Sequence, residues 1–284
     1  MPLASPVYGV SELLQLMARL REPATGCPWD LKQHYRSITP STIEEAYEVV
    51  DAIEREDYAH LKEELGDLLF QVVFYGQLAQ EEGRWSFEDV VHDLTAKLIR
   101  RHPHVFPLGT LASRRSVGDV IDEASIKQSW EAIKQQEREG KGKHGVLADV
   151  PLALPALKRA EKLQKRAASV GFDWGAASEV LEKIEEEVVE LSEVNSSYTQ
   201  AVTEQEKASL ALSVTEELGD LMFSCVNFAR HLKLDSEQVL RAANQKFEKR
   251  FSAMEAQLLS EGVNLEDASP ELMDECWRRV KRAE

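Results

Sequence analysis

Residues 63–70 read EELGDLLF, and residues 216–223 read EELGDLMF. Seven of these eight positions are identical, although the two stretches lie 153 residues apart. Acidic residues precede each copy, and a basic pair spaced i, i+4 follows it. The acidic residues are Glu44, Glu45 and Glu48, then Glu186, Glu187 and Glu190; the basic pairs are Lys97 with Arg101 and Lys246 with Arg250. This constant order indicates an acidic helical unit that occurs twice in tandem.

The hydrophobic pattern around these motifs is that of helices. Thr42 and Glu45 have the spacing of a capping box, and apolar residues then recur at i, i+3 and i+4. The next helix, expected over about 61–79, is apolar on nearly all sides from Leu65 onward, which predicts that it is buried. A further helix is expected over about 87–101. Strand-like alternation between hairpin turns is absent, so the chain is predicted to be all-α.

Composition divides the sequence into two helical domains. Residues 137–145 are polar and glycine-rich, and Pro151 and Pro155 follow them, which is typical of a linker. In the second repeat, residues 195–209 are rich in Ser, Thr and Gln and are expected to form a longer connection than the first repeat has. We therefore expect a domain at 1–135, a linker at 136–155 and a second domain at 156–284.

The carboxylates of each repeat form two pairs, one on each of two successive helices, and each pair is spaced by one helical turn. A carboxylate in a largely buried helix is costly unless it is paired. One such cluster is usually a solvated acidic face. Two matching sets favour a metal site instead, because Mg²⁺ prefers all-oxygen ligands. The pairs are Glu45 with Glu48, Glu64 with Asp67, Glu187 with Glu190, and Glu217 with Asp220.

Two further features repeat in register with the carboxylates. The basic pairs are either surface cations or groups that neutralise phosphate oxygens, and their recurrence favours the phosphate role. Gly66 and Gly219 each cost about 1 kcal/mol relative to alanine within a helix. They predict the close approach of a neighbouring helix, either at the metal layer or in simple helix packing.

Composition also limits the function. The 284-residue chain has a formal net charge of −16, so it would repel a nucleic-acid backbone. A small phosphorylated ligand remains compatible, because a divalent cation can bridge it to carboxylates. The cysteines Cys27, Cys225 and Cys276 are scattered, which disfavours a disulfide framework or a zinc site. Neither a signal peptide nor a membrane-spanning stretch is recognisable, and we expect a cytoplasmic protein.

Glu-Glu-x-x-Glu followed by Glu-x-x-Asp on consecutive helices resembles the all-α nucleoside triphosphate pyrophosphohydrolases. Three further motifs point to the MazG family: GCPWD at 26–30, RRHPHVF at 100–106 and VGFDW at 170–174. The resemblance covers nearly the whole chain. It implies two tandem four-helix domains, a homodimer formed through helix packing, and Mg²⁺-dependent hydrolysis of NTPs and dNTPs to monophosphate and pyrophosphate, a house-cleaning of the nucleotide pool.

The resemblance also implies roles for individual residues. The magnesium ligands would be Glu187, Glu190, Glu217 and Asp220, with Glu45, Glu48, Glu64 and Asp67 as possible ligands in the first repeat. Glu186 and Glu216 would support these ligands or act on the attacking water as catalytic groups. The nucleotide would be bound by Lys183, Lys246, Arg250, Trp277 and Lys281.

The two repeats are not equivalent in this comparison. Ser41 occupies the place of Lys183, and the first repeat has no counterpart of Trp277 and Lys281. The resemblance therefore implies that the C-terminal domain is the main catalytic unit. One departure from the family pattern is Ser213, at a position that usually carries lysine.

Three alternatives remain open on the sequence. The first is a pyrophosphatase of narrower specificity, for dUTP or phosphoribosyl-ATP. The second is a non-catalytic helical dimer that binds nucleotides or partner proteins. The third is a di-iron carboxylate bundle, which is disfavoured because the Glu-x-x-His pairs typical of such bundles are missing.

Overall fold

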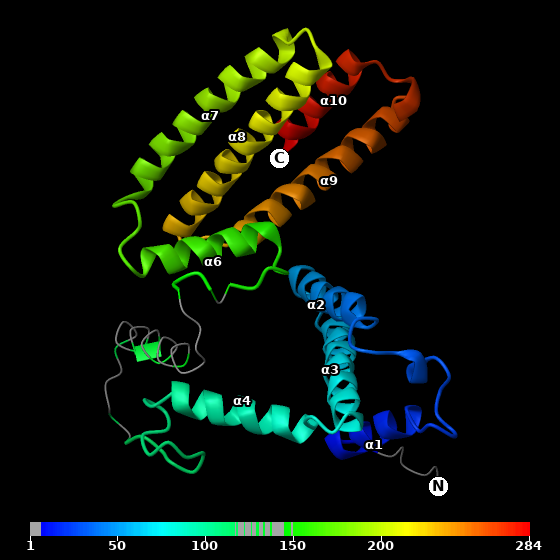
Figure 1. The fold of residues 1–284 in the computed structure, drawn as a ribbon. Helices are drawn as coiled ribbons and strands as arrows, with labels where there is room; N and C mark the ends of the chain where they lie inside the picture. Colours follow the sequence, from blue (N-terminus) through cyan, green and yellow to red (C-terminus); the bar gives the residue numbers. More distant parts are fainter. Residues whose placement is uncertain are drawn as a thin grey trace. The chain divides into compact units, whose positions relative to one another are not determined.

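The computed structural model describes residues 7–116 and 150–284, together with residues 118, 122, 126, 129, 130, 133, 137 and 145–148. The chain divides into two compact units, Met1–Gln135 and Gln136–Glu284. Across the described residues every regular element is helical and none is a strand (Figure 1), which confirms the all-α prediction. Much of the linker predicted at 136–155 lies outside the described residues.

Unit 1 is built around a hairpin of two helices. Helices α2 and α3 make its most extensive contact, and α1 and α4 both pack on α3. Two elements start at side-chain caps: Asp57 accepts a hydrogen bond from the His60 amide at α3, and Ser86 forms a capping box with Asp89 at α4. The helices are α1 Val10–Leu20, the 3₁₀ helix Asp30–Lys32, α2 Thr39–Glu54, α3 Tyr58–Glu81 and α4 Phe87–Arg101 (Figure 1).

The core of unit 1 lies where α1 and the chain before α2 meet the second half of α3. Met17, Val73 and Phe74 are each no more than 1% exposed and belong to one apolar cluster. Gly76 lets α4 begin against α3, because a Cβ atom there would lie 3.1–3.3 Å from Phe87, including its backbone. The core therefore holds the C-terminal half of α3, and the first turns of α3 pack mainly against α2.

Unit 2 repeats the hairpin and extends it. Helices α7 and α8 form its most extensive contact, α6 packs on α8 and α9, and α10 packs on α9 (Figure 1). A second apolar cluster, which includes Leu258 and Cys276, joins α9 to α10. The helices are α6 Ala156–Ala168, α7 Ala177–Gln200, α8 Glu204–His231, α9 Ser236–Ser260, the 3₁₀ helix Leu265–Asp267 and α10 Pro270–Ala283.

Two predictions about helix ends are wrong. Helix α2 begins at Thr39, and the Thr42 hydroxyl contacts the Ile38 carbonyl and the Tyr75 hydroxyl instead of forming a capping box with Glu45. Residues 195–209 are not a long connection, because α7 continues to Gln200 and α8 starts at Glu204. A capping box starts α8: Thr203 accepts a hydrogen bond from the Glu206 amide, and the Glu206 carboxylate accepts one from the Thr203 amide.

The prediction that the EELGD helices are buried on all sides also fails within each unit. Leu65, Leu69 and Val72 are 38–49% exposed on α3. Their counterparts 153 residues later, Leu218, Met222 and Cys225, are exposed on α8. A Cβ atom added at Gly66 or Gly219 would meet nothing within 4 Å, so no helix of the described chain approaches these glycines. Each unit thus presents an apolar stripe at equivalent positions.

Candidate metal and nucleotide site

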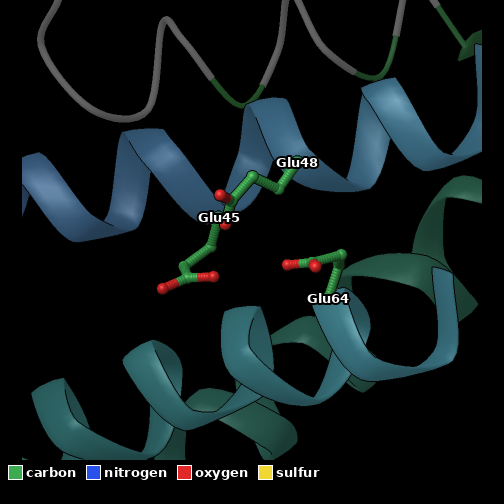
Figure 2. Close-up of side chains that lie close together, drawn as sticks. All are labelled: Glu45, Glu48 and Glu64. Atoms are coloured by element: carbon green, nitrogen blue, oxygen red, sulfur yellow. The ribbon is translucent and has the colours of Figure 1, made fainter. Parts of the chain in front are cut away.

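The hairpin of unit 1 brings three carboxylates together. Oxygen atoms of Glu45 and Glu48 on α2 and of Glu64 on α3 all lie within 4.8 Å of one another. Figure 2 shows the carboxylates of Glu45 and Glu64 projecting between the two helices. Glu64 is 8% exposed, so one member of the group is withdrawn from solvent. A turn of three residues joins α2 to α3, so the two helices run back along each other. Carboxylates at similar distances from this turn therefore lie opposite one another.

The hairpin of unit 2 forms the same group from the second repeat. Oxygen atoms of Glu187 and Glu190 on α7 and of Glu217 on α8 lie within 4.8 Å of one another, and Glu187 is 4% exposed. Here Glu217 follows Glu190 by 27 positions, whereas Glu64 follows Glu48 by 16. The 11 extra residues lengthen both helices beyond the carboxylates, and the group is kept.

Mutual repulsion marks both groups as places for a cation. Burial and then the charges of Glu190 and Glu187 raise the pKa of Glu217. In unit 1, burial and then the charge of Glu48 raise the pKa of Glu64, and burial and then the charge of Asp67 raise that of Glu45. A bound divalent cation would relieve this repulsion, and an all-carboxylate donor set fits Mg²⁺.

Each buried carboxylate already has a basic neighbour one helical turn before it. In unit 1, His60 Nε2 lies 2.7 Å from Glu64 Oε1 on α3. In unit 2, Lys183 Nζ lies 2.9 Å from Oε1 of both Glu186 and Glu187 on α7. Hydrogen bonds to Glu186 and then Glu187 raise the pKa of Lys183, so the ammonium form is firmly held.

The two basic neighbours come from opposite helices of the hairpin. Ser41 stands where α7 carries Lys183, and Ser213, 153 residues after His60, stands where α3 carries that histidine. Lys183 was predicted from the sequence as a site residue, and His60 was not. The available signal was that His60 lies 153 residues before Ser213, at a position that usually carries lysine in the family pattern.

The remaining predicted acidic residues lie beside these groups. Asp67 and Asp220 are exposed and do not belong to the sets of three, although their charges contribute to the raised pKa values of Glu45 and Glu217. Glu186 and Glu216 are exposed, and Glu186 is held by Lys183. The structure therefore brings together three of the four predicted ligands in each repeat.

The predicted nucleotide-binding residues other than Lys183 lie on α9 and α10. Arg250 donates from Nε to the Glu284 carboxylate at 2.9 Å. Trp277 is half-buried and packs against Phe247, with ring centroids 5.5 Å apart. Lys246 and Lys281 are exposed on these helices. Packing of α10 on α9 thus groups the predicted nucleotide-binding residues from two parts of the sequence.

None of the helices in the described part of the chain has the length and apolar character needed to cross a bilayer.

Helical hairpins that each bring three carboxylates together define a class of all-α proteins able to hold a divalent cation. The model of the MazG nucleotide pyrophosphohydrolase domain matches residues 33–106 and 176–254, which contain the two hairpins. The chain belongs to the MazG family. The tandem repeat, the family and the prediction of an enzyme are thereby confirmed.

Similar proteins extend the match to nearly the whole chain. A nucleoside triphosphate pyrophosphohydrolase of Escherichia coli strain K12 is 46% identical over 275 residues, which cover 97% of this chain and 98% of that protein. A Thermotoga maritima protein named nucleoside triphosphate pyrophosphohydrolase/pyrophosphatase MazG is 43% identical, over 95% of this chain and 94% of that protein. An uncharacterized Bacillus subtilis protein, YabN, is 40% identical over 96% of this chain and 52% of its own length.

Proposed function

We propose that the chain hydrolyses nucleoside triphosphates to monophosphate and pyrophosphate in a Mg²⁺-dependent reaction, with its main site in unit 2. The observation that carries this proposal is the group of Glu187, Glu190 and Glu217, whose oxygens lie within 4.8 Å of one another in a hairpin of the MazG family. The names of the Escherichia coli and Thermotoga maritima relatives support the reaction and the substrate class.

The metal would be held by these three carboxylates, with Asp220 as a fourth ligand one turn beyond Glu217. Bound Mg²⁺ would neutralise the triphosphate, orient the bond between the α- and β-phosphates and lower the pKa of a bound water. Glu216 is exposed and outside the group, so it is available to accept the proton of the attacking water, and Glu186 would take this role only after giving up its contact with Lys183.

Basic side chains of unit 2 would bind the phosphates of the substrate. Lys183 lies beside the carboxylates, and Lys246, Arg250 and Lys281 are carried by α9 and α10. Trp277 packs on Phe247 at the same pair of helices and would close over the nucleotide. Unit 1 has Ser41 in place of Lys183, which supports unit 2 as the main catalytic unit.

We also propose that two copies of the chain form a homodimer through the EELGD helices. The apolar stripes of Leu65, Leu69 and Val72, and of Leu218, Met222 and Cys225, are exposed in their units. Surfaces of this kind recurring at equivalent positions are typical of protein interfaces. A second copy would restore the burial that the hydrophobic pattern predicts.

The test is pyrophosphate release from a panel of ribo- and deoxyribonucleoside triphosphates, with Mg²⁺ and with EDTA. We expect release only with Mg²⁺, and a loss of at least about 100-fold in the double variant E187Q/E217Q. The variant E45Q/E64Q should keep most of the activity. Glu204→Gln is the matched control, because Glu204 is 94% exposed in the first turn of α8.

The same panel separates the alternatives. Turnover of dUTP or phosphoribosyl-ATP alone would indicate the narrower pyrophosphatases. Nucleotide binding without turnover would indicate a non-catalytic helical dimer. Full activity in E187Q/E217Q together with its loss in E45Q/E64Q would place the active site in unit 1 and contradict the proposal.

A further inference from the structure

Lys183 is positioned to do more than bind phosphate. Its Nζ lies 2.9 Å from Oε1 of both Glu186 and Glu187, and Glu187 is the buried member of the carboxylate group. The Lys183 side chain is itself 30% exposed and lies one turn before Glu187 on the same face of α7. This ammonium is therefore a counter-ion of the group that is expected to hold the metal.

An ammonium and a divalent cation at this group would compete for the same carboxylate, because Lys183 contacts Oε1 of Glu187. The interaction between two charges grows as their separation shrinks and as the surroundings become less polar, and Glu187 is only 4% exposed. A cation coordinated by Glu187, Glu190 and Glu217 would also withdraw electron density from the oxygen that Lys183 contacts. A metal bound at Glu187 would therefore weaken the contact between Lys183 and Glu187.

We propose that Lys183 is an exchangeable counter-ion: it competes with the divalent cation for Glu187, and the metal releases it to the phosphates of the substrate. This inference rests on the proposed metal site of unit 2. It goes further because it makes the availability of Lys183 for the substrate phosphates depend on metal binding. A nucleotide that arrives before the metal finds Lys183 engaged, and the loaded site offers both positive groups together.

Unit 1 provides an internal comparison. Its buried carboxylate, Glu64, pairs with His60 of its own helix, and Ser41 occupies the place of Lys183. A change at Lys183 therefore alters unit 2 alone. Silencing unit 1 with E45Q/E64Q leaves the unit 2 group as the remaining set of three converging carboxylates in the described part of the chain, and the full-length protein is used.

The experiment is a titration of the E45Q/E64Q protein with Mn²⁺, without nucleotide, in which free Mn²⁺ is followed by electron paramagnetic resonance. Lys183→Met and Lys183→Gln should bind Mn²⁺ about two- to fivefold more tightly than the parent, the range expected for loss of one partly exposed competing charge. Lys183→Arg, which keeps the charge, should bind as the parent does. Lys207→Met is the control, because Lys207 pairs at 3.6 Å with the exposed Glu204.

A second readout is the rise in melting temperature on adding Mn²⁺. It should be larger in Lys183→Met than in the parent, because Glu187 lacks its counter-ion until the metal binds. Glutamine retains a hydrogen-bond donor for Glu187, so Lys183→Gln provides the binding measurement if the methionine variant does not fold. Unchanged or weaker Mn²⁺ binding in folded Lys183→Gln would overturn the exchange and leave the metal site standing. Absence of Mn²⁺ binding in every protein with intact Glu187, Glu190 and Glu217 would overturn the metal site itself.

Discussion

Arg21 holds the chain between α1 and α2 against α3. Its guanidinium donates to both carboxylate oxygens of Glu81, at 2.8 and 2.7 Å, and to the carbonyls of Asp30 and Gln33. The same group lies 5.3 Å from the centre of the Phe74 ring, and the residue is 9% exposed. One side chain thus ties the segment containing GCPWD to the core.

At this residue we predict that Arg21→Met destabilises unit 1 by roughly 2–4 kcal/mol, because it leaves two carbonyls and a carboxylate without their donor. The measurement is urea unfolding combined with hydrogen exchange of the α1 and α3 amides. Arg19→Met, at an exposed position of the same helix, is the control. Equal stability of the two variants would show that water replaces the Arg21 contacts at no cost.

A second residue-scale prediction concerns acid stability of unit 2. Asp235 caps α9 by accepting from the Glu237 and Gln238 amides, and a hydrogen bond from Lys158 is the main cause that lowers its pKa. A lowered pKa in the folded state gives stability that is present above the unfolded pKa of about 4 and is lost as pH falls through the folded value.

Asp235→Asn keeps a side-chain oxygen that can cap α9 but loses the charge that pairs with Lys158, so it should cost about 1 kcal/mol at pH 7 and make stability fall less steeply between about pH 5 and pH 2. Urea melts at several pH values check this. Asp274→Asn, in an exposed pair on α10, should leave the slope nearly unchanged. A parallel loss for wild type and Asp235→Asn over the acid range would contradict the assignment.

The carboxylates of both sites were predictable from spacing, because helical periodicity places residues three and four apart on one face. Their basic neighbours were only partly predictable. Lys183 precedes Glu187 by four residues and followed from the family pattern. His60 has no basic counterpart in the second repeat, so a search for repeated features passed over it. The position of Asp220 outside its group depends on how α8 turns against α7, which spacing alone does not determine.

At the scale of elements, hydrophobic periodicity predicted some helix bounds correctly and others wrongly. The helix expected over 87–101 has these bounds in the structure, where a capping box at Ser86 starts it and Pro103 follows its end. Residues 195–209 were misjudged because polar composition was taken as irregular structure. The Ser197 and Thr199 hydroxyls donate to carbonyls of their own helix, and Thr203 caps the next, so polar residues extend both helices.

The glycines of α3 give a prediction about this element. Gly66→Ala should stabilise unit 1 by up to about 1 kcal/mol, since its Cβ would meet nothing within 4 Å. Gly76→Ala, on the same helix, should cost roughly 1–3 kcal/mol because its Cβ would press on Phe87. Thermal melts of the two variants make the comparison. A loss of stability in Gly66→Ala would indicate that another chain approaches this glycine.

At the scale of the whole molecule, the apolar stripes connect sequence to assembly. The hydrophobic pattern predicts burial of both EELGD helices on all sides, yet each unit leaves Leu65 or its counterpart Leu218 exposed by nearly half. A hydrophobic pattern predicts which side chains are buried, but it does not show whether the same chain or a second copy buries them. The predicted burial and the observed exposure agree if a second copy packs on these helices.

The last prediction tests that association. Met222 is 51% exposed in the stripe of α8, so Met222→Lys places a charge in the proposed interface, where an unpaired charge is costly. We expect light scattering to give a dimer for wild type at micromolar concentration and, for the variant, a dissociation constant raised by at least about tenfold. Leu259→Lys, at a 65% exposed position near the end of α9, is the matched control and should remain a dimer.

Circular dichroism of both variants should retain the helical signal, because neither side chain belongs to a core cluster. A wild-type chain that is monomeric in this range would refute the dimer, and a Met222→Lys dimer as tight as wild type would place the contact on another face.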